Sequence, residues 1–387
     1  MFFGSADIQL SLSFFDSMDS AIPTFMPTTT APKKLELIQV FRGLASVGVL
    51  LTHCGLIFHQ NFSQPFFNGF FDFGGAGVDF FFVLSGFIIF YIHQKDIAHP
   101  EKAKLFFIKR LIRVFPLYWL VLGLKVGTSL LLGYDPDVKT RSLLEFFQAI
   151  VLFPQDRAVL SSSFLGVSWT LSFEMFFYCV FGLAILLPKR LMVPLIGTWL
   201  FGSFANLIGV LQLPPNSMVQ TFWLSPLNLE FALGCFSAYL LRRYRFSNGQ
   251  SIIGIGLFLL SISVVLEVYA TTNGLPPIVN LSSVISYGIP CWVLIIGAVT
   301  LESERTVHVS PILSEIGNAS YSIYLIHGFF INNMSKLLPK ISSSIPQNFW
   351  LLNISGVGLA IASLYFCYGV YRFIEKPMLG FCRKQFG

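Results

Sequence analysis

Charged residues are scarce in this sequence. Asp, Glu, Lys and Arg make up 11% of its 387 residues, whereas ordinary globular domains carry about a quarter. Hydrophobic residues reach 54%, and 43 residues are Phe, which is typical of lipid-facing helices with aromatic ends. The composition therefore excludes a soluble domain and predicts an all-α, polytopic membrane helix bundle.

Metal-binding and redox patterns are also missing. The six Cys residues are scattered, almost all in apolar runs, without a C-x-x-C pair or any metal-ligand spacing. Isolated cysteines of this kind behave as small buried hydrophobes. We therefore expect no metal site.

The first 35 residues lack a secretory signal. They are rich in Ser, Thr, Pro and Met, with no basic stretch followed by an apolar core and a small-residue cleavage site. We predict that residues 1–35 form a disordered cytoplasmic tail.

Ten apolar stretches of about 20 residues follow, the length that a helix needs to cross a bilayer. They predict about ten membrane-spanning helices in one domain, residues 36–380, before a short cytoplasmic tail, 381–387. The predicted spans are 36–58, 76–94, 111–133, 169–187, 192–211, 222–241, 251–270, 283–301, 316–338 and 351–373.

Basic residues are distributed unevenly over the connections between these spans. With a cytoplasmic N-terminus, 19 of the 25 Lys and Arg residues fall on the inner side, and the outer loops 59–75, 212–221 and 271–282 contain none. The positive-inside rule therefore predicts that both termini are cytoplasmic. We expect a multi-pass protein of the inner (plasma) membrane, in contact with membrane lipids. The net charge of +6 follows from the same rule, so no nucleic-acid partner is expected.

The first predicted span contains Arg42 and His53. Eleven residues at about 100° each bring both side chains to one helix face, about 16 Å apart along the axis. Ionisable groups at membrane depth are costly and mark functional sites by default. The pair predicts a site that handles an anionic donor near the inner surface and a proton near the outer one. A hydrogen-bonded core histidine is the alternative for His53.

Asp79 opens the second predicted span, at an outer depth comparable with that of His53. A carboxylate bonded to one imidazole nitrogen fixes the tautomer and raises the basicity of the other nitrogen, as a general base requires. We therefore predict that Asp79 orients His53. The alternative is an acidic residue favoured by the dipole at a helix N-terminus.

Arg110 and Arg113 lie three residues apart at the inner end of the third span, hence on one helix face. Guanidinium groups suit phosphates better than ammonium groups do, so the pair predicts a phosphate-binding site. The alternative is a topology signal in contact with lipid headgroups.

Four later residues complete the set of candidates. Glu174, about a turn and a half into the fourth span, is predicted to be an acid–base partner or a ligand for acceptor hydroxyls. Glu230 and His327 lie nearer mid-depth, where a buried bundle contact and a catalytic role are both open. Glu375 is predicted to form a surface ion pair with Arg372, three residues before it.

The longest outer loop, 134–168, mixes charges with the apolar patch FFQAIVLF (146–153). We expect it to lie in the membrane interface or to fold back over the bundle as a lid that excludes water.

The motifs occur in a defined order: Arg42-x10-His53, GVDFFFVLSGF, KRLIRVFPLYW, GVSWTLSFE, LNLEFALG, SYSIYLIH and YRFIEKP. In this order the chain resembles the acyltransferase-3 family from about residue 35 to 380. This family includes the integral membrane O-acetylases of O-antigen, peptidoglycan and exopolysaccharide. The resemblance implies about ten membrane helices and transfer of an acetyl group from cytoplasmic acetyl-CoA, the co-substrate, to a glycan hydroxyl.

The resemblance also assigns roles. Catalytic roles fall on His53, Asp79 and Glu174, and donor binding falls on Arg42, Arg110 and Arg113. The chain ends soon after YRFIEKP, without the SGNH hydrolase-like domain that some members add. We therefore expect this bundle, or a separate glycan-transfer or export protein, to complete transfer to the glycan or glycolipid acceptor.

The implied mechanism has two open forms. His53 either removes the proton of the acceptor hydroxyl or carries the acetyl group itself. The alternative from another class is a proton-coupled transporter or flippase of a polysaccharide or lipid-linked sugar, with Asp79, Glu174 and His327 as a proton relay. The inner arginines favour the enzyme, because a carrier of neutral sugars does not need them.

Overall fold

The computed structural model describes residues 35–132, 142–154, 165–214, 217–272 and 283–386. Within these ranges every regular element is helical and no strand occurs, which confirms the all-α prediction. The predicted N-terminal tail lies outside them, apart from Leu35.

Each of the ten predicted spans coincides mainly with one helix. They are α2 (Glu36–Phe62), α3 (Ala76–His93), α4 (Ala103–Leu132), α7 (Ser168–Leu186), α8 (Lys189–Leu207), α9 (Leu227–Arg243), α10 (Gly249–Thr272), α11 (Ile289–Glu304), α13 (Ser320–Ser335) and α15 (Phe349–Val370).

Within the described residues, eight of these helices, some extended by adjoining turns, are long and apolar enough to cross a membrane. The other two are α8, which begins with Lys189 and Arg190, and α13, which has 16 residues. Sixteen residues rise only about 24 Å, less than the hydrocarbon core of a bilayer. The cytoplasmic position of the termini remains a prediction.

Short helices complete the chain between and after the spans. They are α6 (Leu143–Ile150), α12 (Pro311–Asn318), α14 (Leu338–Ile341) and α16 (Lys376–Phe386). Five-residue π-helical turns extend three spans at Val219–Trp223, Val284–Gly288 and Tyr371–Glu375. The predicted C-terminal tail therefore continues as helix α16 to Phe386.

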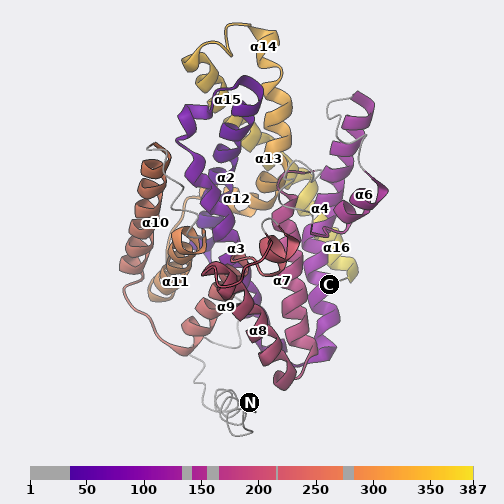
Figure 1. Ribbon diagram of the computed structural model, residues 1–387, viewed down its shortest axis with the longest axis vertical. Helices are drawn as coiled ribbons and strands as arrows, with labels where there is room; N and C mark the ends of the chain where they lie inside the picture. The colour runs from indigo at the N-terminus through magenta and orange to yellow at the C-terminus, as the bar shows by residue number, and fades with distance from the viewer. Residues whose placement is uncertain (1–34, 133–141, 155–164, 215–216, 273–282, 387) are drawn as a thin grey trace.

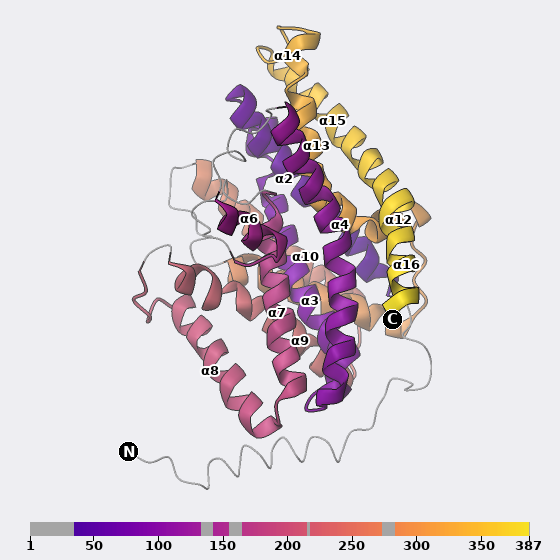
Figure 2. The same cartoon turned by 90° about the vertical axis from the view of Figure 1, so that its right-hand side faces the viewer.

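Two helices form the central seam of the bundle. Helices α2 and α13 lie side by side along the long axis, with α15 beside α13 (Figures 1 and 2). Side chains of α2 meet those of α13 in ascending order along both helices, so the two helices run parallel. Helix α10 lies at the periphery, where only 6% of its span is buried against 72% of the α11 span. The seam is the part of the molecule that positions the candidate residues.

Glycines bring α3 and α9 into close contact. A Cβ atom on Gly86 would lie 2.0 Å from the carbonyl oxygen of Phe231, and one on Gly234 would lie 1.9 Å from that of Val83. Because no side chain fits at either position, the small residues set this crossing. The face of α3 that carries Val83 and Gly86 is therefore occupied by α9.

The start of α2 is held by two neighbouring helices. The Glu302 carboxylate of α11 accepts hydrogen bonds from the backbone N–H groups of Glu36, at 3.1 Å, and Leu37, at 2.5 Å. The Ser314 hydroxyl of α12 donates to the Glu36 carboxylate at 3.0 Å. Helix N-termini leave such N–H groups without intrahelical partners. These contacts therefore fix the first turn of α2, directly before Arg42.

Candidate active site

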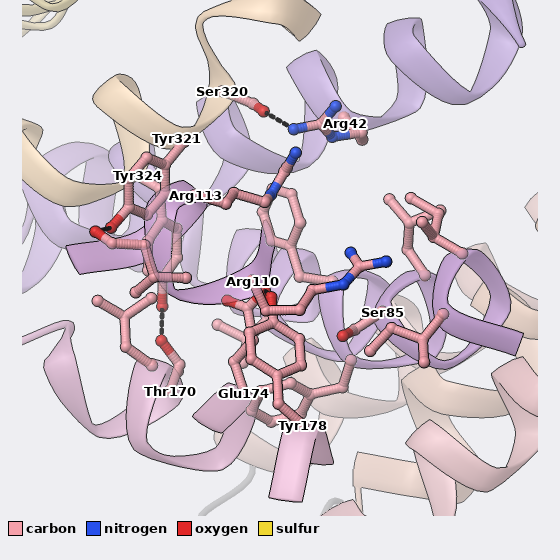
Figure 3. Close-up of a pocket in the computed structure, with 18 residues that line it drawn as sticks. Arg42, Ser85, Arg110, Arg113, Thr170, Glu174, Tyr178, Ser320, Tyr321 and Tyr324 are labelled. Carbon is pink, nitrogen blue, oxygen red and sulfur yellow. Dashed lines mark hydrogen bonds between the residues drawn. The ribbon is translucent and has the colours of Figure 1, made fainter. Parts of the chain in front are cut away.

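A pocket lies between α2, α3, α4, α7 and α13 (Figure 3). It encloses about 890 Å³ of empty space, part of it continuous with solvent. Four predicted residues line it: Arg42, Arg110, Arg113 and Glu174. The structure thus brings together the three arginines predicted to bind the donor, and it adds Glu174, which was predicted to be an acid–base partner or a ligand for acceptor hydroxyls.

Arg42 is tied to two polar neighbours. Its Nη1 donates to Gln39 Oε1 at 3.0 Å, and its Nη2 donates to the Ser320 hydroxyl of α13 at 2.9 Å. Both partners are neutral, so they orient the guanidinium without neutralising its charge.

Arg110 and Arg113 face the same space from α4. The Arg110 guanidinium carbon lies 5.8 Å from the ring centre of Tyr178 and 5.7 Å from that of Phe106, which is within cation–π range. Its Nε is buried and has no hydrogen-bond partner among the described residues. Within the described part of the chain, no carboxylate lies within 4.0 Å of the Arg42, Arg110 or Arg113 guanidinium. The arrangement is suited to an anionic ligand.

Two carboxylates, half-buried Glu174 and buried Glu375, lie close enough to interact with these charges. Glu174 interacts electrostatically with Arg42 and Arg110 and accepts a hydrogen bond from the Tyr178 hydroxyl. Glu375 interacts with Arg42 and Arg113. Three guanidinium groups against two carboxylates leave the pocket with an excess of positive charge when all five are ionised.

The expected ion pair between Glu375 and Arg372 is wrong. Both residues belong to the π-helical turn Tyr371–Glu375, but Glu375 is buried whereas Arg372 is exposed. The Glu375 carboxylate accepts a hydrogen bond from the Ser322 hydroxyl of α13 at 2.5 Å. Glu375 therefore faces the interior of the bundle and balances the arginine cluster.

His53 meets His327 of α13. The Nδ1 of His53 lies 2.6 Å from the Nε2 of His327, and the Nδ1 of His327 lies 2.7 Å from the Ile323 carbonyl oxygen. His327 is fully buried. The histidine pair does not line the pocket but lies next to it, because the Tyr324 ring, which lines the pocket, is centred 6.3 Å from that of His327.

Ser320, Tyr324 and His327 follow one another at intervals of four and three residues along α13, so they share one helix face. Ser320 contacts Arg42, and His327 contacts His53. The spacing within SYSIYLIH was therefore a signal that could have paired His327 with His53, although the sequence alone left the role of His327 open.

Asp79 does not line the pocket, although it belongs to α3, which forms one of the pocket walls. It is 5% exposed, and its electrostatic neighbours include Tyr287 and Cys291, in the π-helical turn Val284–Gly288 and in α11. Glu230 of α9 also interacts with Cys291. The structure thus groups Asp79 with Glu230, and the hydrogen-bonding partner that it gives the Nδ1 of His53 is His327. The catalytic role of Asp79 stays a prediction.

Part of the predicted lid is described. Helix α6 packs on α4: the Tyr118 hydroxyl donates to the Ala149 carbonyl at 2.6 Å, and the Trp119 Nε1 donates to the Ile150 carbonyl at 2.8 Å. Residues 133–141 and 155–164 of the same loop lie outside the described residues. Closure of the site by this loop stays a prediction.

The apolar helices are those of a multi-pass membrane protein, with an arginine-lined pocket inside the bundle. Comparison with known families shows to which class of enzyme it belongs. Residues 36–372 match the acyltransferase-3 family, described as an acyltransferase domain. The chain belongs to this family and is an acyltransferase. Family membership favours acyl transfer over the transporter alternative.

Two relatives carry names consistent with this class. The exopolysaccharide production protein ExoZ of Rhizobium meliloti (strain 1021) is 29% identical over 313 residues, which is 80% of this chain and 90% of ExoZ. The acyltransferase MdmB of Streptomyces mycarofaciens is 24% identical over 283 residues, 68% of this chain and 70% of MdmB. No solved structure matches the chain.

Proposed function

We propose that this protein is an integral membrane O-acetyltransferase of the inner (plasma) membrane. It moves an acetyl group from cytoplasmic acetyl-CoA to a hydroxyl of a glycan or glycolipid. The observation that carries the proposal is the pocket in which Arg42, Arg110 and Arg113 converge, with no carboxylate of the described residues in an ion pair with them. The name of the relative ExoZ, a protein of exopolysaccharide production, supports a surface polysaccharide as acceptor.

The pocket suits acetyl-CoA in its charge and in its apolar wall. Guanidinium groups bind phosphate oxygens through charge-assisted, often bidentate hydrogen bonds. The wall formed by Val78, Phe82 and Ile89 of α3 is apolar, as a pantetheine arm requires. The arginines hold the phosphates, and the thioester reaches toward the histidine pair.

Acyl transfer then needs one base. His53 takes the proton of the acceptor hydroxyl on Nε2 while the oxygen forms a bond to the thioester carbonyl carbon. When the tetrahedral species collapses, the C–S bond breaks, and the proton passes from His53 to the departing thiolate of CoA. The products are the acetyl ester and CoA with a free thiol, so proton and electrons balance and His53 returns to its neutral form.

Glu174 contributes at the arginine end. Its carboxylate limits the repulsion among the three guanidinium groups in the absence of ligand and holds the Tyr178 ring against Arg110. It is thus the residue of the proposed catalytic set that is closest to the donor.

The proposal is tested by mass spectrometry of cell-surface glycans and lipids. A strain that lacks this protein is compared with its parent and with the deletion strain that carries the wild-type protein on a plasmid. The expected result is the loss of acetyl groups in the deletion strain and their return on complementation. Unchanged acetylation would refute the proposal, and intracellular accumulation of an unmodified glycan would favour transport.

A further inference from the structure

The two histidine rings are joined edge to edge. Their centres are 4.8 Å apart and their planes differ by 19°. A ring nitrogen lies about 1.1–1.2 Å from the centre of an imidazole, so a linear, in-plane hydrogen bond with the observed 2.6 Å between nitrogens requires centres about 4.9 Å apart. Rings packed face to face could not bring two nitrogens to 2.6 Å. The contact is therefore a directed hydrogen bond.

A single backbone carbonyl decides the direction of this bond. The Ile323 carbonyl only accepts, so the Nδ1 of His327 must carry a hydrogen and donate to it. In neutral His327 the Nε2 is then an acceptor. The Nδ1 of His53 must donate to it, and the remaining nitrogen of His53, Nε2, keeps its lone pair.

The seam holds the two rings in register. Helices α2 and α13 are tied before the pair by the 2.9 Å bond from Arg42 to Ser320 and after it by the 2.8 Å bond from Asn61 to Ser335. His327 has no exposed surface, so water cannot replace its acceptor nitrogen. The orientation of His53 is thus built into the packing of the seam.

We propose that His327 is the positioning residue for His53. This inference rests on the proposed function, in which His53 is the base. His327 fixes the tautomer of His53 that presents a basic Nε2, and it accepts a stronger, charge-assisted hydrogen bond when His53 becomes protonated. A neutral imidazole anchored to a backbone carbonyl thereby orients His53, the role that a carboxylate has in catalytic triads.

The test compares two amide substitutions of His327. In His327→Gln the side-chain oxygen reaches the position of Nε2 and accepts from His53. In His327→Asn the amide is one methylene shorter, so it reaches the Ile323 carbonyl but not His53. His327→Leu removes both functions, and His59→Ala, at an exposed histidine of the same helix as His53, is the control.

Inverted membrane vesicles from a deletion strain that expresses each variant are supplied with acetyl-CoA labelled in the acetyl group. Transfer of label to the endogenous glycan and lipid fractions is measured over a range of donor concentrations, with rates normalised to the amount of folded protein. We expect His327→Asn and His327→Leu to lower kcat by about 10²-fold, as loss of general-base function does, with the donor KM unchanged. His327→Gln recovers most of the rate, and His59→Ala stays within a few-fold of wild type.

Equal losses in the Gln and Asn variants, a wild-type rate in His327→Leu, or a change confined to KM would each overturn the inference while acetyl transfer by the wild-type protein still stands. If wild-type vesicles transfer no label from acetyl-CoA, the proposed function itself fails and the inference fails with it.

Discussion

The two ends of the α2–α13 seam differ in how fully their polar groups are satisfied. At the end with Arg42, three guanidinium groups face one pocket, with no carboxylate within ion-pair distance among the described residues. Arg42 has two neutral hydrogen-bond partners, and Arg110 lies over two aromatic rings. At the end with His53, the contacts of both rings follow a single chain that ends at the Ile323 carbonyl. One end retains hydrogen-bonding capacity, and the other has a fixed pattern of donors and acceptors.

This difference suggests that the two ends have separate roles in the reaction. A group that must bind an incoming ligand keeps donors free until the ligand arrives, whereas a group that must transfer a proton needs one orientation and one tautomer at all times. The arginine end fits the first requirement and the histidine end fits the second. The comparison predicts that mutations at the two ends change different kinetic constants.

The largest expected effect is an all-or-none difference in accessibility. If the histidine end faces outward, a cysteine at Gln60, at the end of α2, reacts with an impermeant maleimide in intact spheroplasts. A cysteine at Glu101, between α3 and α4, reacts only after lysis. Both positions are exposed. The background carries substitutions of the three native cysteines that are not fully buried, Cys179, Cys235 and Cys382. The opposite labelling pattern would put the arginine pocket on the side that lacks acetyl-CoA.

Substitution of the base should have the next largest effect. We expect His53→Ala to lower kcat by about 10²–10⁴-fold, the usual contribution of general acid–base catalysis, while the donor KM changes less than about twofold. The measurement is label transfer in inverted vesicles at saturating acetyl-CoA. His59→Ala is the matched control, because His59 is an exposed histidine on the same helix. A rate near wild type in His53→Ala would remove His53 from the mechanism.

Smaller effects, on donor affinity, are expected at the arginine end. Loss of a charged hydrogen bond costs about 1.5–3 kcal/mol, so Arg42→Ala and Arg113→Ala should each raise the donor KM by about 10- to 150-fold. The value of kcat at saturating acetyl-CoA should change little. Lysine should restore only part of the affinity, since it lacks the planar fork of arginine.

Arg190→Ala is the control for this experiment, because it removes an exposed basic residue at the start of α8 and should leave the donor KM unchanged. If both pocket variants keep the wild-type KM, or lose kcat alone, the two ends do not divide the reaction as proposed.

The partners of Asp79 could not be predicted from the sequence. Its depth along the span was readable, but its direction depends on which neighbour occupies each face of α3. Asp79, Val83 and Gly86 share one face by their spacing, and that face is the one that packs against α9 through the two glycine contacts. The face that carries Val78 and Ser85 lines the pocket instead. No local pattern distinguishes these two faces, because both are apolar apart from single polar residues.

The sequence by itself determined the features that depend on local periodicity and on transfer from water to lipid. These are the helical class, the positions of the ten apolar helices, the common face of Arg42 and His53, and the proximity of Arg110 to Arg113, since each follows from 3.6 residues per turn or from the cost of burying charge. The tertiary structure decided which residues become partners across the bundle. His327 lies 274 positions from His53, and Glu375 turns from its neighbour Arg372 toward Ser322, 53 positions away. Such contacts arise from the crossing of helices and the close approach of glycines, which a single sequence does not encode in any local pattern.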